Sequence, residues 1–161
     1  MLGYLYIFLY FILTYFVSIN IKSNNFFISK NFKKHYNILI CVLSFVLTIN
    51  ACRIVYIYSF KDIVCYNSFE INIDKDRFIF FILKFVEWMD TMMLIQKFNG
   101  DLSKISNLHY YHHAIVPTMT HYGMYQPGEV YVYLTNSFAH FLMYGYYAFP
   151  EILCLIKPII T

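Results

Sequence analysis

Residues Leu2–Ile19 form a run of 18 residues without a charged side chain. As an α-helix this run would be about 27 Å long, which is close to the thickness of the hydrocarbon core of a bilayer. Its start lacks basic residues, and its end lacks the small residues that a signal-peptide cleavage site requires. The run is therefore predicted to be a membrane helix that is retained in the protein.

Four further segments of the 161-residue chain fit the same interpretation. Three are long apolar runs, Ile38–Phe60, Phe78–Ile95 and Val130–Phe149, and the fourth, His109–Tyr125, is interrupted by Pro117. Proline is tolerated in membrane helices where a neighbour satisfies the carbonyl group that it leaves free. Because 60% of the residues are apolar and only 13% are charged, we predict an all-α, polytopic membrane protein. About five transmembrane helices would form a single domain, residues 1–161, and residues 150–161 would lead toward a further helix.

The charges between these segments predict an orientation. The first connection carries four lysines and no acid, whereas the second, Lys61–Arg77, carries three basic and four acidic residues. The third has Lys97 and Lys104 against Asp101, and the fourth has only Glu129. Cytosolic loops are enriched in Lys and Arg, so the first and third connections are predicted to be cytosolic, with the N-terminus on the opposite side. The net charge of +3 is not gathered into a basic stripe, so no nucleic-acid partner is predicted.

The helix predicted at Phe78–Ile95 has one polar face. Lys84, Glu87, Asp90 and Thr91 fall within an arc of about 120° at 100° per residue. A charged group at membrane depth costs at least about 2.5 to 3.5 kcal/mol, so these groups are expected to face each other, another helix or water. They are either an ion pair that joins helices or the polar wall of a functional site.

Three histidines occupy one face of the next helix. His109, His112 and His113 lie within an arc of about 100°, beside Tyr110 and Tyr111. A single buried histidine is most often a satisfied core residue, but three imidazoles on one face indicate a chemical role. They are suited either to hold a metal ion or to supply a reactive nitrogen.

The last predicted helix carries a third polar stripe. Asn136, His140, Tyr144 and Tyr147 share an arc of about 100°. An aromatic stripe alone is more often core than active site. Asn136 and His140 make the two interpretations about equal, because buried amides and imidazoles in lipid have to find partners. Three successive helices thus each have a polar face, and we predict that the three faces point into one chamber.

A metal site is one interpretation of the histidine face. The stretch "HYYHH" resembles one box of the membrane di-iron desaturases and hydroxylases. Those enzymes use about eight histidines in three boxes, whereas this chain has six histidines and one such box. A di-iron site is therefore poorly supported, and a single metal held by His109, His112, His113 and His140 is the alternative that stays open.

Three stretches taken together resemble a more specific family. "KFVEWMDT" (Lys84–Thr91), "HYYHH" (His109–His113) and "NSFAHFLMYGYY" (Asn136–Tyr147) have the order and approximate spacing found in the fatty acid elongases. These enzymes are the very-long-chain 3-oxoacyl-CoA synthases of the endoplasmic reticulum. The resemblance covers essentially the whole chain, but the family continues with two further helices that this sequence lacks, so it resembles a C-terminally truncated member.

The resemblance implies a seven-helix protein in which six helices enclose a tunnel for an acyl chain. Its reaction condenses a long-chain acyl-CoA with malonyl-CoA, and it needs no metal or redox cofactor. By resemblance, His112 is the nucleophile, and His109, His113 and His140 position it or exchange protons. Other polar residues would bind substrate or shape the chamber: Lys84, Glu87, Asp90, Asn136, Tyr144 and Tyr147.

The same resemblance implies partners and leaves two alternatives of different classes. The expected partners are the lipid bilayer, acyl-CoA, malonyl-CoA, and either the other enzymes of the elongation cycle or a second copy of the chain. A metal-dependent membrane lipid desaturase or hydroxylase is the first alternative. The second is a truncated membrane protein that catalyses nothing, which would tolerate the loss of His112 and His140.

Overall fold

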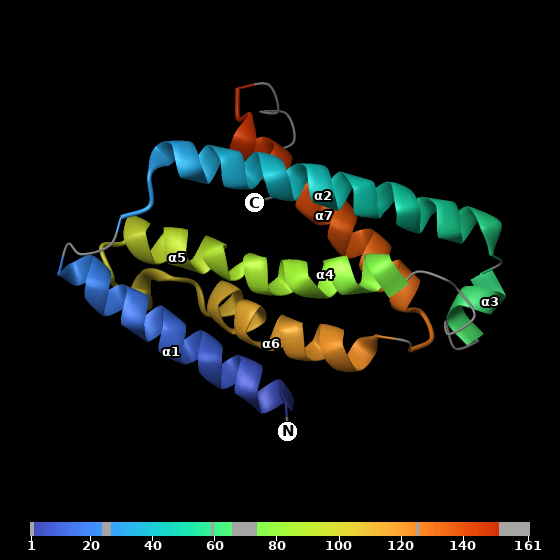
Figure 1. Ribbon diagram of the computed structural model, residues 1–161, viewed down its shortest axis with the longest axis horizontal. Helices are drawn as coiled ribbons and strands as arrows, with labels where there is room; N and C mark the ends of the chain where they lie inside the picture. Colours follow the sequence, from blue (N-terminus) through green and yellow to red (C-terminus); the bar gives the residue numbers. More distant parts are fainter. Residues whose placement is uncertain (1, 24–26, 59, 66–73, 125, 152–161) are drawn as a thin grey trace. The chain divides into compact units, whose positions relative to one another are not determined.

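All regular structure in the described part of the chain is helical. The computed structural model describes residues 2–23, 27–58, 60–65, 74–124 and 126–151. Its elements are α1 (Leu2–Lys22), α2 (Lys30–Ile57), α3 (Phe60–Cys65), α4 (Asp74–Val86), α5 (Trp88–Lys97), the 3-10 turn η2 (Leu102–Lys104), α6 (Asn107–Gly123) and α7 (Glu129–Ala148) (Figure 1). The prediction of an all-α protein is confirmed. The predicted approach to a further helix, in residues 150–161, lies almost wholly outside the described residues.

Two helices, α1 and α2, are long and apolar enough to cross a membrane. The 21 residues of α1 extend over about 32 Å, and large apolar side chains such as Tyr4, Phe8 and Phe16 are exposed along it. Contiguous exposed apolar surface of this kind marks contact with a membrane or with another protein. The fold is that of a polytopic membrane protein, while the full count of five spans stays a prediction.

The helix bounds correct two details of the sequence interpretation. Lys22 is the last residue of α1, and Lys30, Lys33 and Lys34 belong to the first turns of α2, so all four lysines lie on helix ends and the connection, residues 23–29, carries none of them. The span predicted at Phe78–Ile95 is divided between α4 and α5 at Glu87. The Asp90 N–H bonds to the Glu87 carbonyl three residues earlier, which tightens the turn there.

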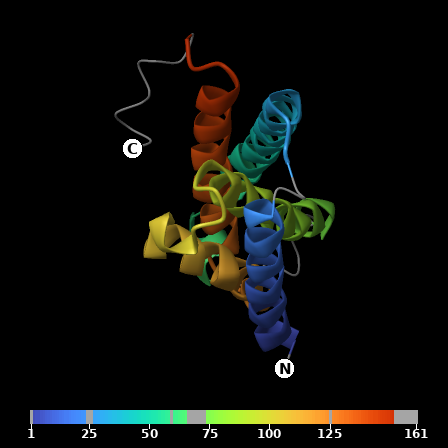
Figure 2. The same ribbon diagram turned by 90° about the vertical axis from the view of Figure 1, so that its left-hand side faces the viewer.

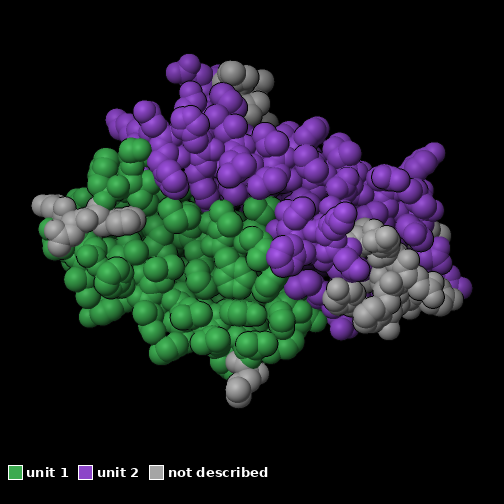
Figure 3. All heavy atoms as spheres, in the orientation of Figure 1, with its two compact units in different colours: residues 1–29, 81–123 green, residues 30–80, 124–161 purple. Residues whose placement is uncertain are grey.

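Contacts divide the chain into two units, which Figure 3 shows in different colours. Unit 1 comprises residues 1–29 and 81–123, and unit 2 comprises residues 30–80 and 124–161. Whether the two units form one transmembrane domain depends on how they pack together, so the single domain, residues 1–161, stays a prediction.

In unit 1, α1 packs along α6 and against α5, and Figure 2 shows α1 and α6 side by side. The helices approach closely at Gly3, whose carbonyl accepts a hydrogen bond from the Thr118 hydroxyl (2.9 Å). A Cβ at Gly3 would lie 2.5 Å from Thr118 Cγ2. Small residues allow such close approach where helices pack within a membrane.

The connection after α5 is also fastened to α1. Gly100 adopts a φ of +81° and its carbonyl accepts a 2.6 Å hydrogen bond from the Ser18 hydroxyl. After it, the Asp101 carboxylate caps η2 by accepting from the Ser103 hydroxyl (2.7 Å) and backbone N–H (3.1 Å). These hydrogen bonds hold the pKa of Asp101 below its ordinary value. The loop that precedes the histidine helix is thereby held against α1.

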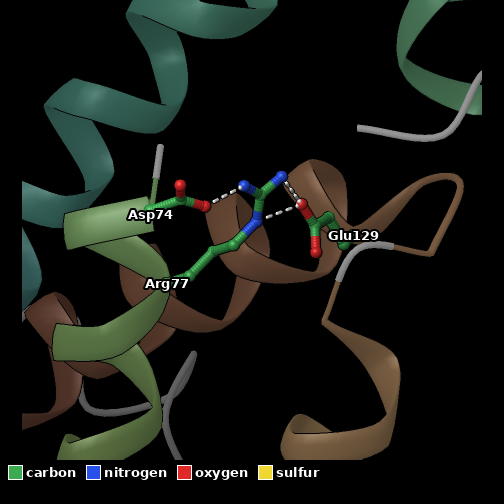
Figure 4. Close-up of polar contacts among 3 residues, drawn as sticks. All are labelled: Asp74, Arg77 and Glu129. Atoms are coloured by element: carbon green, nitrogen blue, oxygen red, sulfur yellow. Dashed lines mark hydrogen bonds and ion pairs between the residues drawn. The ribbon is translucent and has the colours of Figure 1, made fainter. Parts of the chain in front are cut away.

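In unit 2, α2 and α7 form the main helix pair, through ring contacts such as Phe45–Phe141 and Tyr36–Tyr144. The start of α4 is joined to the start of α7 by Arg77 (Figure 4). Its guanidinium donates to Asp74 at 2.8 Å and to Glu129, with Nε 2.7 Å from Oε1. Arg77 is buried, so this pairing compensates a charge that water does not reach.

Candidate functional site

The three histidines of α6 lie next to one another, as their spacing predicts. The ring centroids of His109 and His113 are 4.3 Å apart, and those of His112 and His113 are 5.6 Å apart. Their exposures differ, because His113 is buried, His109 is half-buried and His112 is exposed. The imidazole of His112 is thus the most accessible of the cluster.

Pro117 lies one helical turn beyond His113 and influences it directly. Proline has no N–H, so the carbonyl of the residue four positions earlier, His113, loses its usual helical donor. The Trp88 indole N–H of α5 donates to this carbonyl instead, at 2.9 Å. A neighbouring helix thus satisfies the carbonyl that Pro117 leaves free, the condition under which membrane helices tolerate proline. The hydrogen bond ties α6 to α5 at the histidine cluster.

Tyr110 anchors the same turn of α6 to α1. The Thr14 hydroxyl donates to the Phe11 carbonyl (3.0 Å), so its oxygen is left to accept the proton of the Tyr110 hydroxyl at 2.8 Å. The Tyr110 ring also packs on Tyr10 and Phe11. We assign Tyr110 to helix packing.

A second hydrogen-bonded chain reaches His109 from two other helices. Thr91 Oγ1 of α5 lies 3.2 Å from His109 Nε2, and 2.9 Å from the hydroxyl of Tyr10 in α1. Both Tyr10 and Thr91 are fully buried. The sequence placed Thr91 on the polar face of its helix, but it contained no signal for Tyr10, which is one of several tyrosines in an apolar run.

The charged residues of the predicted polar face are brought together in unit 1. Lys84 Nζ lies 2.7 Å from Glu87 Oε1, and both side chains are at most 3% exposed. Asp90 is half-buried on the following turn and adds its negative charge to the field at Lys84. An ion pair is one of the two interpretations that the sequence allows for this polar face, and a Lys84–Glu87 ion pair does form. Each of the two buried charges is compensated by the other.

The α7 stripe belongs to unit 2. The ring of His140 lies 5.5 Å from that of Tyr144, which in turn lies 6.3 Å from that of Tyr147. Tyr144 is fully buried, Asn136 and His140 are half-buried, and Tyr147 is exposed. The stripe is thus a continuous row of side chains, as predicted.

Two hydroxyl groups that the sequence did not single out lie on the same helix. Within the described residues, the buried hydroxyls of Tyr133 and Ser137 have no hydrogen-bond partner. A buried polar group without a partner costs about 1 to 3 kcal/mol.

Site residues of the three predicted polar faces thus fall in both units. Unit 1 contains the neighbouring His109, His112 and His113 and, where α4 meets α5, the Lys84–Glu87 pair. Unit 2 brings together His140, Tyr144 and Tyr147. Convergence of His140 on the α6 histidines stays a prediction. No group of three or more His, Cys, Asp or Glu side chains in the described ranges is arranged to hold a metal ion.

Comparison with known proteins agrees with the motifs. The ELO family model, described as the GNS1/SUR4 family, matches residues 1–161. No solved structure matches the chain. Among curated proteins, Fatty acid elongase 6 of Leishmania major is 36% identical over 81 residues, which is 48% of this chain and 21% of that protein.

Two further relatives have similar names. Putative fatty acid elongase 4 of Caenorhabditis elegans is 36% identical over 104 residues, 62% of this chain and 34% of the relative. Very long chain fatty acid elongase 7 of Drosophila melanogaster is 32% identical over 71 residues, 42% of this chain and 21% of the relative. The chain thus spans about a fifth to a third of the length of these curated relatives. With a family match over its whole length, the chain belongs to the ELO (GNS1/SUR4) family, and the resemblance predicted from its three motifs is confirmed.

Proposed function

We propose that this chain carries the histidine centre of an acyltransferase of fatty acid elongation. The reaction condenses a long-chain acyl-CoA with malonyl-CoA and yields a 3-oxoacyl-CoA, CoA and carbon dioxide. Family membership and the names of the relatives support this reaction class. The observation that carries the proposal is the exposed imidazole of His112 beside the buried imidazole of His113.

The first step is acyl transfer to His112. A neutral imidazole nitrogen attacks the thioester carbonyl, the carbon–sulfur bond breaks, and CoA leaves as a thiolate that takes up a proton. The attacking nitrogen has to be reachable by substrate, and His112 is the most exposed of the three rings. His109 and His113 position this ring or exchange its proton.

The second step uses malonyl-CoA. Loss of carbon dioxide leaves the electron pair on the α-carbon, which attacks the acyl carbonyl and releases the imidazole of His112. Donors are needed for the negative charge that develops, and Asn136 and Tyr144 are proposed to supply them, with His140 exchanging a proton. Because the Lys84 ammonium is already paired with Glu87 at 2.7 Å, these two residues and Asp90 are assigned to the polar wall, and Tyr147 to its rim.

The proposal includes a cellular setting. The protein is assigned to the endoplasmic reticulum membrane, with its N-terminus lumenal and the histidine helix entered from the cytosolic side, where both CoA substrates occur. No metal or redox cofactor takes part in the two steps above. The enzymes that reduce and dehydrate the product, or a second copy of the chain, are the proposed protein partners.

Acyl capture tests the proposal. The purified chain in lipid nanodiscs is incubated with a long-chain acyl-CoA, quenched, and measured by intact mass spectrometry. We expect one acyl group per chain, which hydroxylamine removes, because acyl-imidazoles are reactive acyl donors. His112→Ala should abolish the adduct and any incorporation of malonyl carbon.

His35→Ala is the matched control, because His35 is an exposed histidine that bonds to the Asn31 carbonyl (2.7 Å) at the start of α2. This variant should be acylated like the unchanged chain. Acylation of His112→Ala at the unchanged level would remove the nucleophile assignment. Stoichiometric iron or zinc in an active sample would favour the metal-dependent alternative.

A further inference from the structure

The hydrogen-bonded chain from Tyr10 through Thr91 to His109 joins α1, α5 and α6 of unit 1. Its two distances, 2.9 Å and 3.2 Å, are those of hydrogen bonds. Among the described residues, the Tyr10 hydroxyl bonds to no other group, and Thr91 Oγ1 bonds only to Tyr10 and His109. Because both residues are fully buried, neither hydroxyl can donate its proton to water. Each proton therefore has to be donated within the row of hydrogen bonds Tyr10–Thr91–His109.

Counting the protons leaves one arrangement. Tyr10 has one proton, and among the residues that the structure describes its only acceptor is the Thr91 hydroxyl oxygen. Thr91 then has one proton of its own to donate, and Nε2 of His109 is the only acceptor left for it in the described part of the chain. If Nε2 carried a proton instead, the O–H of either Tyr10 or Thr91 would be a buried donor without an acceptor. The full desolvation penalty of that group would then destabilise the protein.

We infer that Tyr10 and Thr91 are positioning residues that hold His109 as the neutral tautomer with its proton on Nδ1 and Nε2 as acceptor. The tautomer and the ring orientation of a histidine are set by the hydrogen bond that its other nitrogen makes. The Nδ1–H of His109 is then the donor available to the rest of the cluster, in which the ring of His113 lies 4.3 Å away. The value of this donor for acyl transfer rests on the proposed function, but the tautomer itself does not.

The tautomer can be measured directly. The chain is labelled with 15N in its histidine rings and placed in lipid nanodiscs without substrate, and the ring nitrogen shifts are recorded by NMR. His109 is assigned by comparison with His109→Gln. We expect a protonated Nδ1 and an unprotonated Nε2. A protonated Nε2 in the unchanged chain would overturn the inference.

Variants of the chain test which residues set the tautomer. Thr91→Val keeps the side-chain shape but removes the donor to Nε2, and Tyr10→Phe frees the Thr91 proton from its fixed direction. Each should raise the population of the Nε2–H form several-fold, and Thr91→Ser should restore the original spectrum. An unchanged His109 spectrum in Thr91→Val would also overturn the inference.

Thr14→Val is the control, because Thr14 is another fully buried hydroxyl of α1, and its hydrogen bonds are to the Phe11 carbonyl and the Tyr110 hydroxyl. Its His109 spectrum should equal that of the unchanged chain. Failure of acyl capture at His112 together with the expected tautomer would defeat the proposed function alone. Normal acyl capture together with a protonated Nε2 would defeat this inference alone.

Discussion

Trp88 and Pro117 both determine the environment of a single carbonyl group, that of His113. Pro117 removes the helical donor and Trp88 supplies a replacement at 2.9 Å. The Trp88 ring also packs on Tyr10 and Phe85, with centroids 5.3 Å and 5.1 Å away. The packing and the polar contribution of Trp88 can therefore be separated by experiment.

Trp88→Phe should keep most of the ring packing while it leaves the His113 carbonyl without a donor. We expect a loss of about 1 to 3 kcal/mol in the free energy of unfolding, the cost of a buried acceptor without a partner. Reversible unfolding in mixed micelles, followed by circular dichroism, measures this loss.

Combining Trp88→Phe with Pro117→Ala makes a double-mutant cycle. Alanine returns a backbone N–H to the position four residues after His113, so the His113 carbonyl regains a helical donor. The double variant should recover much of the stability that Trp88→Phe loses, which gives a coupling free energy between the two sites. Strictly additive effects would show that the indole N–H does not compensate for the proline.

At the same scale, the sequence predicts the spacing of the α6 histidines but not their different exposures. The pattern of positions i, i+3 and i+4 fixes which rings are neighbours on a helix. It cannot tell that His113 is turned inward and His112 outward, because that depends on the helix against which α6 packs. Tyr10 was missed for the same reason, since its partner Thr91 lies 81 positions away.

At the scale of helices, the two terminal helices of the described chain were predictable within a few residues, whereas α2 begins eight residues before the predicted run and α3 was not predicted. The runs Leu2–Ile19 and Val130–Phe149 correspond to α1 (Leu2–Lys22) and α7 (Glu129–Ala148). The break between α4 and α5 was not predicted, because no Gly or Pro marks it. It lies at Glu87, whose side chain is directed back to Lys84 one turn earlier.

Arg77 is the main polar link between α4 and α7 in unit 2. It is 5% exposed, as against 10% for Glu129 and 68% for Asp74. Removing one partner of a buried ion pair costs about 3 to 5 kcal/mol. We expect Glu129→Gln to cost about 3 kcal/mol, at the low end of that range, because Asp74 keeps part of the compensation.

Asp74→Asn is the matched control for the same guanidinium. Because the Asp74 carboxylate is largely exposed, its loss should cost no more than about 1 kcal/mol. The unfolding measurements described for Trp88 compare the two variants. Equal losses would mean that burial of the Glu129 carboxylate adds nothing to the pair.

At the scale of the whole molecule, composition and hydropathy were sufficient for the fold class. Apolar runs of membrane-spanning length and few charges predict helices in lipid, and an all-helical chain of the ELO family is what results. The predicted chamber between the polar faces would depend on the packing of helices distant in sequence, which hydrophobic periodicity does not encode. His112 of unit 1 and His140 of unit 2 are the pair on which that prediction depends.

The orientation of the chain is a prediction of the same scale. Lys104 lies on the connection between α5 and α6, which with Lys97 at the end of α5 has two bases against Asp101, and Asp62 lies between α2 and α4, in the connection with the most acids. Both side chains are exposed. In a chain whose four native cysteines are replaced by serine, Lys104→Cys should react with a membrane-impermeant maleimide in sealed microsomes. Asp62→Cys should react only after the membrane is permeabilised.

Each cysteine variant is a control for the reactivity of the other, because both should be labelled fully once detergent opens the microsomes. The expected contrast follows from the retention of Lys and Arg on the cytosolic side of short loops. The proposed orientation would place the start of α6, and with it the exposed His112, toward the compartment that contains acyl-CoA and malonyl-CoA. Protection of Lys104→Cys with labelling of Asp62→Cys in sealed vesicles would invert the topology. The proposed nucleophile would then lie toward the lumen, away from both substrates, and the condensation could not proceed there.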